Sequence, residues 1–121
     1  MAGLEIKSTG APDEVREFAD GTGATHLVRL ETGLVGYGVF EPGWRWSQHI
    51  APIAGTHSCQ TSHLGYCISG RMHVVMDDGT EGEVGPGDVV RIAPGHDAWI
   101  VGDEPCVLVD YGQLDNSAKS S

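Results

Sequence analysis

Residues 57–99 read HSCQTSHLGYCISGRMHVVMDDGTEGEVGPGDVVRIAPGHDAW, and they hold four of the six histidines and two of the three cysteines. Short apolar runs in this stretch alternate with turn signals, such as Asp77-Asp78-Gly79 and Gly85-Pro86-Gly87-Asp88. This spacing is typical of short β-strands joined by tight turns. Such strands can bring side chains that are distant in sequence to one place, and we expect the functional site there.

Period-two patterns continue on both sides of this stretch. Residues 25–31 and 34–40 are candidate strands joined at Thr32-Gly33, which predicts a hairpin. The segment from Trp44 to His49 alternates aromatic and polar residues, so we expect a strand with both indoles on one face, in the core or in a pocket wall. Residues 97–101 and 105–111 bring the total to about nine strands. The sequence therefore predicts an all-β fold, an antiparallel sandwich or barrel with little helix.

We expect one domain, because 121 residues are enough for one hydrophobic core but not for two domains. Residues 1–24 are predicted to form an arm, with at most two helical turns over Asp13–Ala19. Residues 25–112 form the predicted β-domain, in which residues 51–56 are a loop. Residues 113–121 are expected to be a disordered tail, because the end of the chain is polar.

Composition argues against several classes of partner. The net charge is −10, from 17 acidic and 7 basic residues, which disfavours binding to nucleic acid and to anionic membranes. No apolar run approaches the roughly 20 residues that a membrane-spanning helix needs. Three cysteines and no signal-like apolar stretch at the start argue against a disulfide framework. We therefore expect a soluble, cytoplasmic protein.

Four side chains are candidate metal ligands: His57, Cys59, His63 and His96. One residue separates His57 from Cys59, so on an extended strand both side chains leave from the same face, and His63 begins the next strand. Imidazole and thiolate ligands without a carboxylate favour a divalent zinc ion, while nickel, copper and iron remain alternatives. If Cys59 does not bind, three histidines and a water leave the open position that a catalytic metal needs.

Each candidate also has a structural interpretation. His57 fits an exposed loop equally well, Cys59 fits a small buried hydrophobe, and His96 fits a cap on the preceding Pro-Gly turn. His63 is the strongest candidate. Asp97 either orients a neighbouring imidazole or lies solvated in a turn. The two other cysteines fall in apolar strands and are predicted to be inert: Cys67 and Cys106.

The run Gly87-Asp88-Val89-Val90-Arg91-Ile92-Ala93-Pro94-Gly95-His96 resembles the second motif of the cupins, and His63 followed by Gly70 resembles the end of their first motif. The resemblance covers about residues 35–112. It implies an antiparallel jelly-roll β-barrel with a metal or small-molecule site at one mouth. It also implies a homodimer.

The sequence departs from the cupin motifs at the residues that usually bind metal. The places of the two histidines and the glutamate of the first motif are taken by His57, Cys59 and His63. In the second motif, Ala98 stands in the place of the histidine, and His96 lies two residues before it. The usual iron shell of three histidines and one glutamate therefore cannot form as such.

Two functions from different classes follow from these residues. The first is a metal-dependent enzyme that acts on a small polar metabolite, with the metal polarising a carbonyl group or activating water. The second is a non-catalytic module that holds a small ligand in the barrel for sensing or storage. No nucleophile triad or nucleotide-binding fingerprint distinguishes between them.

Overall fold

The computed structural model describes residues 3–113, and it contains nine strands and three short helices. The strands are β1 (Glu14–Glu17), β2 (Gly23–Leu30), β3 (Gly33–Phe40), β4 (His63–Ser69), β5 (Met72–Met76), β6 (Glu81–Val84), β7 (Val89–Ile92), β8 (His96–Ile100) and β9 (Cys106–Gln113). The helices are the 3-10 turn η1 (Ala19–Gly21), α1 (Trp46–His49) and α2 (Ala51–Ala54). The all-β class predicted from the sequence is confirmed.

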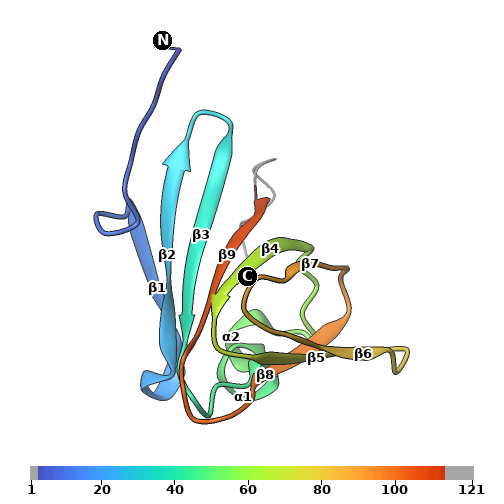
Figure 1. The fold of residues 1–121 in the computed structure, drawn as a ribbon. Coiled ribbons are helices and arrows are strands. Elements are labelled where there is room, and N and C mark those ends of the chain that lie inside the picture. The colour runs from blue at the N-terminus through green and yellow to red at the C-terminus, as the bar shows by residue number, and fades with distance from the viewer. Residues whose placement is uncertain (1–2, 114–121) are drawn as a thin grey trace.

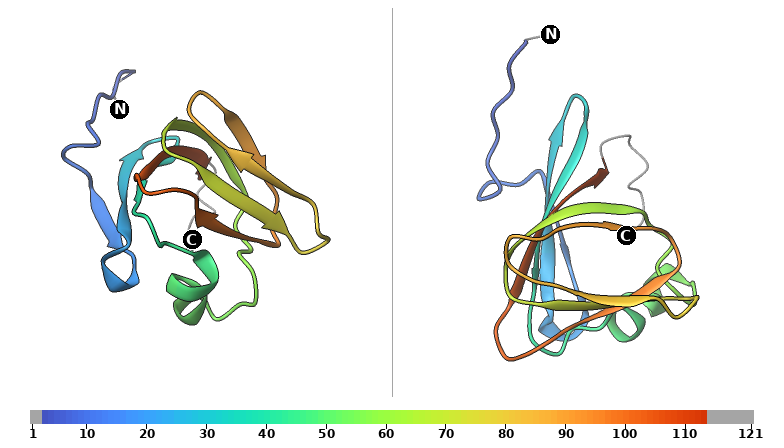
Figure 2. Two further views of the ribbon diagram at one scale, coloured as in Figure 1. Left: turned by 60° about the horizontal axis from the view of Figure 1, so that its bottom comes forward. Right: turned by 45° about the vertical axis from the view of Figure 1, so that its right-hand side comes forward.

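The strands form two antiparallel sheets, whose elements Figure 1 labels. The large sheet has six strands in the order β1-β2-β3-β9-β4-β7, and the small sheet has three in the order β6-β5-β8. In the right-hand view of Figure 2 the small sheet lies opposite β4 and β7 of the large sheet, with α1 and α2 to one side. Among residues 3–113 no pairing of named strands joins the two sheets into a closed barrel.

Both predicted hairpins form, but the turn between β2 and β3 lies one residue earlier than the predicted Thr32-Gly33. Strands β2 and β3 pair antiparallel with Leu30 opposite Gly33, so Glu31 and Thr32 make the two-residue turn. Strands β5 and β6 pair across the turn that contains Gly79, whose φ of 93° lies in the left-handed region open to glycine. Turn chemistry therefore sets both local pairings.

The hydrophobic core lies between the two sheets. The large sheet contributes Cys67, Ile92 and Cys106, and the small sheet contributes apolar side chains such as Met72 and Ala98. All of these side chains are buried. Cys67 and Cys106, predicted to be inert, are fully buried free thiols, and burial raises the pKa of both.

The predicted N-terminal helix is wrong. Residues Glu14–Glu17 form β1, which pairs antiparallel with the outer edge of β2. Burial alternates along β1, with Val15 and Glu17 more exposed than their neighbours. A four-residue segment gains more from pairing with an open sheet edge than from an isolated helical turn, because short helices are marginal in water. Only the 3-10 turn η1 follows it.

The predicted strand at Trp44–His49 and the predicted loop at residues 51–56 are wrong in part, because α1 takes up Trp46–His49 and α2 takes up Ala51–Ala54. A tertiary contact explains α1: Asp97 Oδ1 accepts a hydrogen bond from Ser47 N at 3.1 Å, at the start of the helix. The backbone N–H of Arg45 also donates to His49 Nδ1 at 3.0 Å. Both indoles nevertheless reach the core, as predicted, since Trp44 and Trp46 are each 5% exposed.

No helix among residues 3–113 has the length and apolar character needed to cross a membrane. The tail predicted to be disordered, residues 113–121, lies outside the described residues except for position 113.

Replacing Gly70 by alanine should destabilise the protein more than the same change at Gly79. Both glycines have positive φ, but a Cβ at Gly70 would lie 2.2 Å from Pro105 O, whereas nothing lies within 4 Å of one at Gly79. We expect Gly79→Ala to lower the free energy of unfolding by about 1 kcal/mol, because of backbone strain. We expect Gly70→Ala to lower it by about 3 kcal/mol, because the overlap of the new Cβ with Pro105 O adds to that strain. Urea denaturation measures both, and equal losses would contradict the packing at Gly70.

Candidate metal centre

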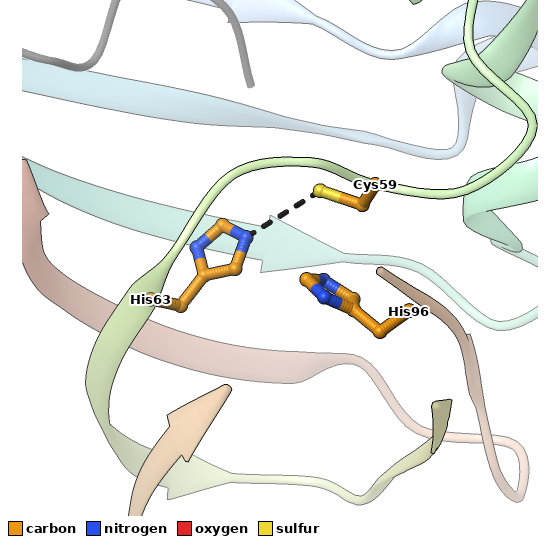
Figure 3. A group of neighbouring side chains, drawn as sticks. All are labelled: Cys59, His63 and His96. Atoms are coloured by element: carbon orange, nitrogen blue, oxygen red, sulfur yellow. Dashed lines mark hydrogen bonds between the residues drawn. The ribbon is translucent and has the colours of Figure 1, made fainter. Parts of the chain in front are cut away.

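Three of the four predicted ligands converge. The side chains of Cys59, His63 and His96 point toward one another in Figure 3, and one potential ligand atom from each lies within 4.8 Å of the others. The Sγ atom of Cys59 is 3.7 Å from His63 Nε2, and the two imidazole rings are 5.2 Å apart between centroids. Among residues 3–113, these three are the one set of His, Cys, Asp or Glu side chains in which at least three members lie close enough together to hold a single ion.

Backbone pairing brings Cys59 and His96 together. Cys59 forms an isolated antiparallel bridge with His96, the first residue of β8. The Cys59 N–H donates to the His96 carbonyl oxygen at 2.7 Å, and Gly95 N donates to the Cys59 carbonyl oxygen at 2.7 Å. Directly opposed residues of an antiparallel pair carry neighbouring side chains. The two candidate ligands thus meet although 37 positions separate them in the numbering.

The third candidate ligand, His63, is oriented by the large sheet. His63 begins β4, and the register of β4 with β9 places Gly65 opposite Asp110. His63 and Gly65 share a face, so Asp110 is a diagonal neighbour of His63. The distance from His63 Nδ1 to Asp110 Oδ2 is 2.6 Å, which is a charge-assisted hydrogen bond.

Both imidazoles have one ring nitrogen already engaged. His63 Nδ1 donates to the Asp110 carboxylate, and His96 Nδ1 donates to the Ala93 carbonyl oxygen at 2.9 Å. The Nε2 atoms are therefore the ones left to bind an ion beside the Cys59 sulfur. Metal-binding histidines commonly have this arrangement, in which the partner of one nitrogen fixes the ring and raises the basicity of the other.

The charges of the cluster are coupled. Burial alone would raise the pKa of Cys59, but hydrogen bonds from His63 and His96 outweigh it and lower the pKa to about 6. Burial alone would lower the pKa of His63, but hydrogen bonds with Asp110 and Cys59 outweigh it and raise the pKa to about 9. Near neutral pH the Cys59–His63 pair therefore holds one proton and carries a thiolate, the form of cysteine that binds metals.

The fourth predicted ligand does not join the cluster. His57 is exposed, in the segment between α2 and β4, and lies outside the group of three. Asp97, which had two interpretations, makes no hydrogen bond or ion pair with either imidazole among the described residues. Its carboxylate accepts hydrogen bonds from the backbone of Ser47 and Ala98, and it lies 3.5 Å from Arg45 Nε.

Sequence reasoning missed Asp110, the carboxylate that orients His63. A signal was present, because Asp110 is the single acidic residue in the apolar run Cys106-Val107-Leu108-Val109-Asp110-Tyr111. Buried carboxylates are rare without a partner, so an acid in such a strand indicates an interaction. Which residue it contacts depends on the β4–β9 register, which no local pattern specifies.

The centre forms part of the wall of a cavity of about 120 Å³. The other walls are mostly apolar, and four aromatic side chains contribute to them: Phe18, Phe40, Trp44 and Trp46. Three glycines on the inner face of the large sheet also line it, at positions 36, 38 and 65. Because they carry no side chain, the sheet leaves room beside the three ligands.

Comparisons with solved structures place the fold. An uncharacterized conserved protein with a double-stranded beta-helix domain from Klebsiella pneumoniae aligns with a TM-score of 0.55 at 20% identity, over 88% of this chain and 87% of that one. FeII HppE aligns with a TM-score of 0.65 at 8% identity, over 89% of this chain and 59% of that one. The polyketide cyclase RemF from Streptomyces resistomycificus aligns with a TM-score of 0.62 at 17% identity, over 88% of this chain and 77% of that one.

Sequence comparison identifies the family. Comparison with curated protein sequences gives no match. The family model described as Cupin domain matches residues 39–112, which include all three converging ligands and Asp110. This match spans more than half of the 121 residues, so the chain belongs to the cupin family.

Proposed function

We propose that Cys59 Sγ, His63 Nε2 and His96 Nε2 bind one divalent transition-metal ion, and that the chain is a metal-dependent enzyme for a small molecule held in the adjoining cavity. The observation that carries the proposal is the pair of imidazoles whose Nδ1 atoms are already engaged, by Asp110 and by the Ala93 carbonyl. This leaves Nε2 of each ring as the nitrogen that can bind an ion, and His63 Nε2 lies 3.7 Å from Cys59 Sγ.

The donor set supports zinc ahead of the alternatives. One thiolate and two imidazoles are borderline to soft ligands, which suit zinc and leave nickel, copper and iron as second choices. A structural zinc site usually has four protein ligands, whereas this site offers three. The fourth position would be open to water or substrate, as is typical of catalytic zinc sites. A bound ion of this kind polarises a carbonyl group or lowers the pKa of a water.

The chain's own residues supply orientation and exclusion of water. Asp110 fixes the ring of His63, and the backbone bridge fixes Cys59 against His96. The apolar walls contributed by Trp44 and Trp46 surround the site with a low-polarity medium, in which electrostatic interactions are stronger than in water.

A non-catalytic ligand-binding role is the second candidate, and one observation favours it. Apart from the three candidate ligands, Asp110 is the one titratable side chain among the cavity-lining residues that the structure describes, so general acid–base groups are scarce. The Asp110 carboxylate is already bonded to His63. Turnover by the metal-loaded protein would separate the two roles. The homodimer and the cytoplasmic location stay predictions.

Purified wild-type protein should bind one equivalent of zinc, and Cys59→Ala, His63→Ala and His96→Ala should each weaken binding by more than about 100-fold, because each removes a direct ligand. Mass-spectrometric metal analysis and competition with a chromogenic chelator measure stoichiometry and affinity. His57→Ala is the matched control, because this imidazole lies outside the cluster. Loss of zinc in the control would restore His57 as a ligand, and zinc binding unaffected by all four changes would refute the site.

Replacing Asp110 by asparagine should weaken zinc binding by about 10- to 100-fold, because the amide neither stabilises the His63 Nδ1–H as a carboxylate does nor raises the basicity of Nε2. The same chelator competition measures the change. Asp103→Asn removes the same charge from an exposed turn and should leave the affinity unchanged. Equal losses in the two variants would indicate a general charge effect instead of an oriented imidazole.

Zinc affinity should rise with pH in two regimes. Between pH 6 and 9 the Cys59–His63 pair holds one proton, which zinc must displace, so affinity rises about tenfold per pH unit. Below pH 6 the thiol is protonated as well, and the slope approaches about 100-fold per unit. Titrations from pH 5 to 8 measure the slope, and calorimetry in two buffers of different ionisation enthalpy counts the protons. A flat profile above pH 6 would contradict the shared proton.

A further inference from the structure

One row of side chains crosses the outer face of the large sheet. Directly opposed residues of antiparallel strands point to the same face, and the register therefore aligns one residue from each of the six strands. From β1 to β7 these are Val15, His26, Tyr37, Val109, Tyr66 and Val89. The row points away from the small sheet, because Gly65 and Cys67, the neighbours of Tyr66 on β4, face the cavity and the core.

This outer face is apolar and exposed. Five of its large apolar side chains are between 40% and 73% exposed: Leu64, Tyr66, Ile68, Val89 and Tyr111. They share the face of the row, since Leu64 and Ile68 lie two positions from Tyr66, and Tyr111 lies two positions from Val109. An antiparallel sheet with one face on the core commonly carries polar residues on the other face, and a contiguous exposed apolar patch marks an interaction surface.

The outer face is large enough for a stable interface. Strands lie about 4.8 Å apart and rise about 3.4 Å per residue, so six strands of four to eight residues cover about 600 Å² in projection. Protruding side chains expose more area than this projection, which brings the face close to the roughly 800 Å² that each partner contributes to a standard interface.

Charged side chains are scarce on this face. The protein has 17 acidic residues, but the four strands β3, β9, β4 and β7 contain one acidic residue, Asp110, and it bonds to His63 on the inner face. Two charged residues occupy outer-face positions, Glu17 on the edge strand β1 and Arg91 on the edge strand β7. Neither makes an ion pair within residues 3–113.

This distribution of charge matches the face to a second copy of itself. A face with an acid at one edge and a base at the opposite edge is complementary to itself, because a two-fold axis through its centre can place each base opposite the acid of the other copy. The central strands carry no acid on this face, so two acidic chains can meet there without direct repulsion. A nucleic acid or an anionic membrane would instead be repelled by the net charge of −10.

We propose that two copies of this chain pack the outer faces of their large sheets together about a two-fold axis, with Tyr66 and Val89 in the buried part and Arg91 near Glu17 of the partner subunit. The proposal gives the homodimer predicted from the sequence a specific surface. It does not depend on the candidate metal centre, because His63 and Asp110 lie on the inner face of the sheet.

Sedimentation equilibrium of the full chain tests this interface. The wild-type protein should have about twice the monomer mass of 12.8 kDa at micromolar concentration. Tyr66→Glu and Val89→Glu should each weaken the dimer by more than about 100-fold, because each buries a carboxylate in an apolar interface. Ile53→Glu is the matched control, since Ile53 is an aliphatic residue on α2 that is 78% exposed, and the dimer should persist in this variant.

Each outcome decides for or against the outer face. Circular dichroism and thermal denaturation check that the variants fold, and Val89→Glu keeps the test decisive if Tyr66→Glu does not, because Val89 is 73% exposed. A wild-type protein that stays monomeric at high micromolar concentration would refute the proposal. So would a dimer that withstands both variants, an equal loss in Ile53→Glu, or a wild-type monomer that sediments with phosphatidylcholine vesicles.

A charge exchange tests the two-fold arrangement. Arg91→Glu should weaken the dimer about tenfold, because it places like charges together at two symmetric positions, and adding Glu17→Arg should restore most of the loss. A purely structural effect of Arg91→Glu would not be rescued by a change on the opposite edge of the sheet. Loss without rescue would overturn the arrangement.

Discussion

The register between β4 and β9 ties the candidate centre to the fold. Gly65 lies opposite Asp110, so the carboxylate leaves the inner face diagonally across from His63 and reaches its Nδ1 atom at 2.6 Å. A slip of one residue would turn Asp110 to the outer face and leave the imidazole without its partner. Strand pairing, which is a property of the backbone, thus determines which nitrogen of His63 faces Cys59.

The cavity combines two environments that are rarely adjacent. On one side are a thiolate and two imidazoles, and on another are aromatic side chains, including Trp44 and Trp46. The apolar walls strengthen the electrostatic coupling between Cys59 and His63, because little solvent screens it. The same walls make it unfavourable to bury a polar group without a hydrogen bond, so an occupant would gain specificity from a few polar contacts. A small chain can in this way build a selective site with few functional groups.

The fold class, the presence of the hairpins and the three converging candidate ligands could be predicted from the sequence, because alternation, turn residues and ligand chemistry are local signals. His96 was recognised as a candidate although it lies two residues away from the expected motif position. The helix at Trp46 could not be predicted, since its first turn is stabilised by Asp97, distant in sequence. The role of Asp110 and the exclusion of His57 likewise depend on strand pairing and on the path of a loop.

The attachment of Cys59 has a kinetic consequence. The chain between α2 and β4 is joined to β8 through the backbone of Cys59, with Ser58 Oγ donating a further hydrogen bond to Asp77. Opening this crossover breaks fewer hydrogen bonds than separating any central strand, so it belongs to the least stable part of the structure. An ion held by Cys59 Sγ would therefore be released by local opening of one short segment, without unfolding of the sheets.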